Sequence, residues 1–165
     1  MLENRVKIVY LGIGSNLGNR KKNIEEAKIN LIKNNINILK CSNYYESLSW
    51  PDIKNPSFLN IVINVSTNLS ATKLLEICKK IEIQLGRKKG PKNSPRECDI
   101  DIIDYNKEKS IGNIILPHPL MHLRNFVLFP LFEINKDWKH PVSKHHIKTL
   151  ISTLSNKDIR SIKQI

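Results

Sequence analysis

The stretch Cys98–Tyr105 (CDIDIIDY) carries two carboxylates at alternate positions, Asp99 and Asp101. Its apolar and β-branched residues predict a β-strand, in which residues i and i+2 lie on one face, ~6.5 Å apart along the chain. Two carboxylates on one face repel each other unless a cation lies between them. Magnesium ions that bridge a polyphosphate fit this arrangement. The alternative is a solvated strand face without a ligand, which a lone Asp-x-Asp pattern also allows.

A basic loop directly precedes this strand. Arg87–Arg96 (RKKGPKNSPR) contains one glycine, two prolines and five Lys or Arg residues. The 27 basic residues of the chain comprise 21 Lys and only six Arg, so a retained Arg indicates a need for the bidentate guanidinium group. Arg87 and Arg96 lie in this loop, and Arg124 follows later in the chain. Acidic and basic groups at one sheet edge favour a metal–triphosphate site.

Two other motifs resemble known binding sites only superficially. The segment Gly12–Asn19 has the spacing G-x-G-x-x-x-G, whose third glycine is misplaced by one for a dinucleotide fingerprint, and no Lys-Ser/Thr follows as in a P-loop. We interpret it as a plain strand–helix turn. His118 and His122 form an H-x-x-x-H pair, but Pro119 stands where a zinc-peptidase helix needs Glu. This Pro-flanked backbone is better explained as holding His118 in a fixed place.

Aromatic residues are few, and three positions matter for ligand binding. Phe58 and Asn60 are expected on one face of a strand over Phe58–Thr67, and Phe126 follows Arg124. A phenylalanine is most often a core residue. Phe58, however, stands at a strand start beside the long loop Glu46–Pro56, which is a common location for ligand contacts.

The elements that must position these residues follow from apolar periodicity. Strands are predicted at Lys7–Ile13, Ile36–Tyr45, Phe58–Thr67 and Cys98–Tyr105. One helix is predicted around Ile24–Ile32, ending at Asn34-Asn35, and a second after an N-cap at Ser70, ending at Gly86. The order β-α-β-β-α-β predicts an α+β, ferredoxin-like core. Helices around Leu123–Ile134 and His145–Leu154 form a C-terminal helical extension, and residues 1–165 are expected to be one domain.

The composition excludes several classes of protein. No apolar run approaches the ~18 residues of a membrane span, and the charged residues of Met1–Lys7 argue against a signal peptide, so we expect a cytoplasmic protein. Three widely spaced cysteines predict free thiols in a reducing compartment. The net charge of +12 favours a phosphate-bearing ligand only weakly, because Lys is used along the whole chain.

Two rival functions remain open from the residues alone. A ferredoxin-like nucleic-acid-binding module would use the +12 charge, but no strand carries the aromatic pattern of an RNA-binding sheet. A small-ligand regulatory domain would not need Asp99, Asp101 and three converging arginines. A salt titration of RNA binding, beside an assay of ATP turnover, separates these possibilities from an enzyme.

Several motifs together resemble the 6-hydroxymethyl-7,8-dihydropterin pyrophosphokinase family. The resemblance runs from about Lys7 to Pro141, in the order and near-spacing of the family. The motifs are Lys7–Arg20 (KIVYLGIGSNLGNR), Phe58-Leu59-Asn60, Ile81-Glu82-x-Gln84-x-Gly86-Arg87, Pro95-Arg96-x-x-Asp99-Ile100-Asp101-Ile102, Leu116-Pro117-His118, and Arg124-x-Phe126-x-Leu128-x-Pro130-Leu131. No single motif is decisive, but six in series are highly specific.

The resemblance implies an ATP-dependent diphosphokinase of folate biosynthesis, with magnesium as cofactor and ATP as co-substrate. It implies transfer of pyrophosphate from ATP to the pterin alcohol, giving the pterin diphosphate and AMP. We expect the protein to be a monomer without nucleic-acid or membrane partners. The implied metal ligands, for two magnesium ions, are Asp99 and Asp101. The implied catalytic residues are Arg96, Asp99, Asp101, His118 and Arg124.

The resemblance also assigns the substrates. The pterin would stack between Phe58 and Phe126, with its edge bound by Asn60, Asp99 and the loop at Ser47 and Leu48. The implied ATP-binding residues are Glu82, Arg87, Lys89, Arg96, Ile102, His118 and Arg124. Two positions depart from the family pattern: Phe58 replaces a common Tyr, and Lys92–Arg96 (KNSPR) lacks the usual Arg and Trp. The second departure concerns the loop that covers ATP.

Overall fold

The computed structural model describes residues 5–165, so the expectation for Met1–Asn4 lies outside the described residues. Within that range, six strands form one antiparallel sheet in the order β5-β1-β4-β3-β6, and β2 pairs with β4 beside β3. The strands are β1 (Lys7–Ser15), β2 (Asn37–Cys41), β3 (Tyr45–Ser47), β4 (Phe58–Thr67), β5 (Asp99–Tyr105) and β6 (Lys163–Gln164). The predicted α+β class is confirmed.

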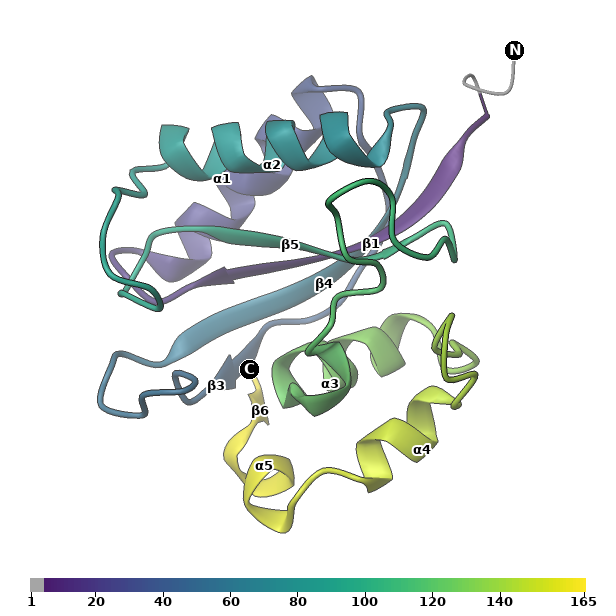
Figure 1. Cartoon of the computed structure of the whole chain (residues 1–165). Helices are drawn as coiled ribbons and strands as arrows, with labels where there is room; N and C mark the ends of the chain where they lie inside the picture. The colour runs from purple at the N-terminus through teal and green to yellow at the C-terminus, as the bar shows by residue number, and fades with distance from the viewer. Residues whose placement is uncertain (1–4) are drawn as a thin grey trace.

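Helices cover both faces of the sheet (Figure 1). The first pair, α1 (Arg20–Lys33) and α2 (Ala71–Gln84), lies on one face. The C-terminal helices α3 (Asn125–Ile134), α4 (Ile147–Ser152) and α5 (Asn156–Ser161) lie on the other side, and a 3₁₀ turn over Met121–Leu123 leads into α3. Among residues 5–165, no helix combines the length and the apolar character that crossing a membrane requires.

Local signals in the sequence set the ends of the first two helices. The Asn19 side chain accepts a hydrogen bond from the Lys22 amide at the start of α1, and Ser70 accepts one from Lys73 at the start of α2. Gly86, with φ +111°, follows Leu85, the C-cap residue of α2. The prediction of an N-cap at Ser70 and of a stop at Gly86 is therefore confirmed.

One predicted strand is divided in the structure. The range Ile36–Tyr45 was predicted to be continuous, but it forms β2 and β3 with a break between them. At the break, the Ser42 amide donates to the Val62 carbonyl oxygen and the Ser42 hydroxyl accepts from the Val62 amide, both at 3.0 Å. The side chain thus takes the place of a main-chain carbonyl in the ladder, and this interrupts the regular strand.

Three other predictions need correction. Gly12 and Gly14 belong to β1, so the turn within Gly12–Asn19 is shorter than predicted and centres on Gly18, with φ +73°. The predicted helices at Leu123–Ile134 and His145–Leu154 are present as the shorter α3 and α4. The sequence did not predict α5 and β6, although β6 pairs with Tyr45 and Glu46 of β3.

Two apolar clusters lie on opposite faces of the sheet. The larger one packs α1 and α2 against residues such as Leu11, Ile61 and Ile100. The smaller one packs α3 and α4 against Val62 and Ile103, among others. The second cluster does not extend to the Ser15 end of β1, and that end of the same face carries polar residues.

Candidate active site

Cross-strand pairing places each of the two aspartates opposite a glycine of β1. Gly14 of β1 pairs with Asp99 of β5 on one side and with Asn60 of β4 on the other, and Gly12 pairs with Asp101. Paired residues share a face of the sheet. A Cβ atom on Gly14 would lie 2.7 Å from Oδ1 of Asn60, so this position requires glycine. The two glycines leave a hollow between the carboxylates and Asn60.

Aromatic side chains surround this hollow. Phe58, Phe126 and Trp50 line it, and Gly12 and Gly14 form part of its floor. Asn60, which is buried, donates a 2.9 Å hydrogen bond from Nδ2 to the Ser47 hydroxyl. The result is an aromatic pocket with a fixed amide in its wall, an arrangement suited to a flat, polar-edged ring.

A second, basic pocket adjoins the aromatic pocket. Its lining includes Lys79, Arg87, Lys88, Lys92 and His118, mostly from the loop over Arg87–Arg96 and its surroundings. The two pockets share one wall, formed by Asn93, Arg96, Asp99, Asp101 and Arg124. A group bound in one pocket therefore meets a group bound in the other at the two carboxylates.

Two arginines hold Asp99 in its ionised form. Nη1 of Arg87 lies 3.0 Å from Oδ1, and Nη2 of Arg96 lies 2.8 Å from Oδ2. Burial opposes ionisation of Asp99, but the charges of Arg96 and Arg87 outweigh it and lower the pKa of this carboxyl. Arg87 is itself fixed by the buried Glu82, 2.6 Å away.

Asp101 behaves differently from its neighbour. Burial, together with the charge of Asp99, raises its pKa from the ordinary 3.8 to about 6, and Arg124 at 3.4 Å offsets this only in part. The carboxylate therefore lacks a full complement of cationic partners. A doubly charged cation between the two aspartates would remove this repulsion.

His118 faces Asp101 as a neutral ring. Burial and the nearby Arg124 guanidinium lower its pKa to about 4. Nδ1 accepts a hydrogen bond from the Leu120 amide at 3.1 Å, so the neutral ring carries its proton on Nε2. That nitrogen lies 4.0 Å from Oδ2 of Asp101, and it offers a hydrogen-bond donor rather than a charge to the shared wall.

Arg96 and Arg124 each keep an unused donor. Within residues 5–165, their Nε atoms are the buried side-chain nitrogens or oxygens without a hydrogen-bond partner. The Arg96 guanidinium lies 5.1 Å from the Phe58 ring, and that of Arg124 lies 5.5 Å from both Trp50 and Phe126. Both guanidinium groups thus retain hydrogen-bonding capacity for an anion at the boundary of the two pockets.

Comparisons with known proteins agree with this site. The family described as 7,8-dihydro-6-hydroxymethylpterin-pyrophosphokinase (HPPK) matches residues 10–136. The chain is 39% identical over 141 residues to the 2-amino-4-hydroxy-6-hydroxymethyldihydropteridine pyrophosphokinase of Aquifex aeolicus, covering 85% of this chain and 88% of that protein. The Bacillus subtilis protein of the same name is 36% identical over 129 residues, 77% of each chain.

The chain belongs to the HPPK family. It is an ATP-dependent diphosphokinase that transfers pyrophosphate from ATP to 6-hydroxymethyl-7,8-dihydropterin in folate biosynthesis. The fold agrees with a crystal structure of Plasmodium falciparum HPPK-DHPS with pteroate, with a TM-score of 0.71 at 16% identity, over 90% of this chain and 42% of that one. The resemblance found in the sequence motifs is thereby confirmed.

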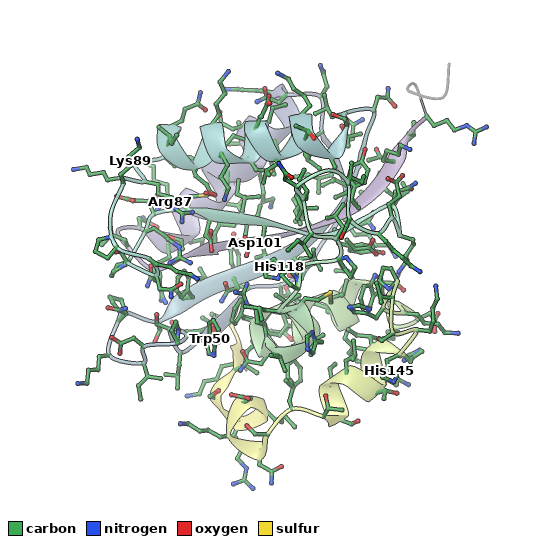
Figure 2. The ribbon with its side chains drawn as sticks, viewed as in Figure 1. Trp50, Arg87, Lys89, Asp101, His118 and His145 are labelled. Carbon is green, nitrogen blue, oxygen red and sulfur yellow. The ribbon has the colours of Figure 1, made fainter. Side chains whose placement is uncertain are left out.

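Most of the residues expected from the HPPK motifs come together in space. Figure 2 shows Asp101 and His118 close together near the middle of the molecule, with Trp50 beyond them. Six expected residues line the basic pocket or its shared wall: Arg87, Arg96, Asp99, Asp101, His118 and Arg124. Phe58, Asn60 and Phe126 line the aromatic pocket. Ser47 is buried behind Asn60, where it holds the amide.

Besides Ser47, four expected residues lie outside the linings of these two pockets. Lys89 is exposed on the outer side of its loop (Figure 2), and Leu48, also largely exposed, lines a neighbouring hollow. Glu82 is buried beneath Arg87, and the Ile102 side chain packs in the apolar core. Conversely, the sequence analysis missed Trp50, Gly12 and Gly14. The two glycines at alternate positions of a strand were a usable signal, but they were interpreted as a turn.

The donor set suits the magnesium on which HPPK enzymes depend. In the described part of the chain, no three His, Cys, Asp or Glu residues gather into a complete metal site. Asp99 and Asp101 supply hard carboxylate oxygens beside a pocket for phosphates. Magnesium commonly takes one or two carboxylates and completes its shell with phosphate oxygens and water, so the residues present fit this ion.

Proposed function

We propose that this chain carries out the HPPK reaction at the wall shared by its two pockets. The pterin occupies the aromatic pocket, and the ATP triphosphate occupies the basic one. The observation that carries this proposal is the shared wall itself, because Asp99, Asp101, Arg96 and Arg124 line both pockets. A pterin hydroxyl and an ATP phosphate placed on opposite sides of it are held together for reaction.

Phe58 and Phe126 supply the stacking faces for the pterin. Asn60 binds the polar edge of the ring, and its orientation is set by Ser47. Leu48 of the same loop adjoins this edge from the neighbouring hollow. Phe58 lacks the hydroxyl of the tyrosine common in the family, but its ring provides the same stacking area.

Arginine side chains and a histidine hold the triphosphate. Arg96 and Arg124 offer their free Nε donors, and His118 donates from Nε2. Arg87 and the exposed Lys89 add positive charge from the loop. Glu82 and Ile102 lie at the nucleoside end of the ATP site. Because the Ile102 side chain is buried, its main chain is the part that contacts the nucleoside.

Asp99 and Asp101 are the ligands that we assign to two magnesium ions. When bound, magnesium supplies charge neutralisation for the phosphates and alignment of the reacting oxygen with phosphorus. Asp99, kept ionised by its arginines, is also able to accept a hydrogen bond from the pterin hydroxyl.

The reaction itself asks little covalent work of the protein. The hydroxymethyl oxygen attacks the β-phosphorus of ATP, the bond between the β-phosphorus and the α,β-bridging oxygen breaks, and AMP leaves. As the new oxygen–phosphorus bond forms, the hydroxyl proton passes to solvent, directly or through the Asp99 carboxylate that accepts its hydrogen bond. Arg96, Arg124 and His118 stabilise the negative charge that moves onto the departing AMP phosphate.

The direct test measures AMP release from ATP, with and without the pterin alcohol and magnesium. AMP formation that requires all three components is the expected result. ATP hydrolysis independent of the pterin would contradict the pterin as the acceptor. RNA binding that weakens steeply with salt, in a chain without AMP release, would support the rival nucleic-acid module instead.

The remaining proposals concern the context of the enzyme. We propose that residues 1–165 form a single, ferredoxin-like catalytic domain, on the basis of the observed strand order with β2 and β3 sharing the outer edge of β4. We also propose a cytoplasmic monomer without nucleic-acid or membrane partners. Light scattering of the purified chain tests the oligomeric state.

A further inference from the structure

The C-terminal segment, residues 156–165, connects two sides of the aromatic pocket. At one end, Nδ2 of Asn125 donates to the Asp158 carbonyl oxygen at 2.7 Å and to the Ser161 hydroxyl at 3.3 Å, both in α5. At the other end, β6 pairs with β3, and the Ile165 amide donates to the Tyr44 carbonyl oxygen. Figure 1 shows the chain end beside β3 and α5 close by.

Asn125, the first residue of α3, lies in sequence between two residues that enter the site: Arg124, the N-cap residue of the helix, and Phe126. Arg124 and Phe126 line the aromatic pocket, whereas Asn125 does not; it is 9% exposed and lines the adjoining hollow with Asp158 and Ser161. Successive residues of a helix point ~100° apart. Fixing the Asn125 side chain therefore fixes the directions in which its two neighbours leave the backbone.

Arg124 needs such support because its own side-chain contacts are weak. Its Nη1 lies 3.4 Å from Oδ2 of Asp101, at the long end of the hydrogen-bonding range, and its Nε has no partner. Arg124 is also the N-cap residue of α3 and makes no side-chain capping bond. The backbone at the start of α3 is therefore the main determinant of where the guanidinium lies.

The same segment is tied to the strand that supports Asn60. Gln164 of β6 pairs with Tyr45, and the Tyr45 hydroxyl donates to Oε2 of Glu133 on α3 at 2.9 Å. Ser47, which holds Asn60, lies two residues further along β3. The C-terminal segment thus links β3, which supports the Asn60 wall of the aromatic pocket, to α3, which supplies Phe126 to the opposite wall.

We propose that Asn125 is a positioning residue for pyrophosphate transfer. By fastening the first turn of α3 to α5, it aims Arg124 at the phosphates and Phe126 at the pterin, without touching either substrate. This inference rests on the roles assigned above to Arg124 and Phe126.

The sharpest variant is Asn125→Asp, which keeps the shape of the side chain but loses both donors. A carboxylate in the first turn favours the helix dipole, so α3 itself is not weakened, while it repels the Asp158 carbonyl oxygen. Displacing reacting groups by about 1 Å costs up to about 100-fold in rate. We expect turnover and pterin-analogue affinity to fall about 10- to 100-fold, with a smaller loss for a magnesium–ATP analogue. Asn125→Ala should behave in the same way.

A spectroscopic signal distinguishes positioning from general loss of stability. Trp50 lies 5.5 Å from the Arg124 guanidinium, so its emission should change in the ligand-free Asn125 variants. The matched control is Asn30→Ala, which removes another side-chain amide that donates to a main-chain carbonyl, in α1 on the opposite face. The control should retain wild-type turnover, pterin affinity and Trp50 emission.

Two results would overturn the inference. In the first, both Asn125 variants have a lowered Tm but keep wild-type turnover and pterin affinity. In the second, neither variant can be obtained folded, which would make Asn125 a structural residue. Phe126→Ala, measured in parallel, separates this from the proposed site. If Phe126→Ala weakens pterin binding while both Asn125 variants do not, only the positioning role fails. If Phe126→Ala also leaves pterin binding unchanged, the assigned pterin site is wrong.

Discussion

Nη1 of Arg87 lies 3.0 Å from Oδ1 of Asp99, so a guanidinium group occupies a carboxylate oxygen that a metal ion would use. Magnesium must displace it. We predict that Arg87→Gln binds Mg²⁺ more tightly than the wild type when no nucleotide is present. The measurement is the rise in Tm on adding MgCl₂, which should be larger in the variant. The control is Lys80→Gln, which removes the same charge from an exposed site on α2. An equal rise in Tm in that variant would show that net charge, and not the contact of Arg87 with Asp99, causes the effect.

Asp101→Ala should lose at least ~10³-fold in turnover, because the phosphates are no longer held in line. Its Tm at pH 7 without ligands should equal or exceed that of the wild type. The pKa of Asp101 is raised from 3.8 to about 6 in the folded protein, so its charge destabilises the fold above pH 6. Any Tm advantage of the variant should therefore shrink as the pH falls through 6 and vanish below 4. Full turnover in this variant would remove Asp101 from the site.

Asp99→Ala should be equally inactive but should change stability in the opposite direction. Its removal deprives Arg96 of its carboxylate partner and leaves Arg87 paired with Glu82 alone, at a cost of about 1–3 kcal/mol. The pKa of Asp99 is lowered in the folded state, so its stabilising contribution is present above the ordinary value of 3.8 and is lost as the pH falls further. Thermal melts of both aspartate variants across pH 3–8 test this contrast. Identical profiles for the two would contradict the observed pairing.

Phe126→Ala should weaken the binding of a pterin analogue by about 1–3 kcal/mol and leave a magnesium–ATP analogue nearly unaffected, because one stacking face is lost. Calorimetry with each ligand provides the measurement. Phe132→Ala is the control for lost stability, because Phe132 lies on the same helix and is likewise half-buried against the smaller apolar cluster, but it does not line the pocket. Unchanged pterin affinity in Phe126→Ala would make Phe126 a core residue.

The loop over Arg87–Arg96 should become protected when nucleotide binds. Lys88, Lys89 and Lys92 are exposed, and few apolar contacts hold this loop. We predict that a non-hydrolysable ATP analogue with magnesium slows trypsin cleavage at these lysines. Cleavage after the exposed Lys144, in a distant turn, should be unchanged. Equal cleavage of the loop in both conditions would count against its covering ATP.

Trp50 should report pterin binding by fluorescence. The chain has two tryptophans: Trp50 is half-exposed and lines the aromatic pocket, whereas Trp138 is 1% exposed and donates to Asp104 in the core. A pterin analogue should quench the emission of the wild type, and Trp50→Phe should lose the saturable part of that response while it retains binding by calorimetry. Persistent quenching in Trp50→Phe would place the ligand elsewhere.

Patterns within single elements were the most predictable part of the fold and the site. The alternation in Phe58–Thr67 gave the bounds of β4 as the structure has them, and the Asp-x-Asp pattern placed both carboxylates on one face. What could not be predicted depends on contacts between distant segments. The break at Ser42 requires Val62, the pairing of β6 requires β3, and the place of Trp50 depends on how its loop meets α3.

The floor of the aromatic pocket is main chain, and this restricts how resistance to an inhibitor could arise. A ligand that contacts Gly14 touches atoms that no substitution removes. Adding even a methyl group there would place it 2.7 Å from Oδ1 of Asn60 and 3.3 Å from the Phe58 ring, so the change would also disturb two groups assigned to the natural substrate. Compounds that depend on this floor should therefore select for escape at the exposed rim, around Trp50, rather than at their main point of contact.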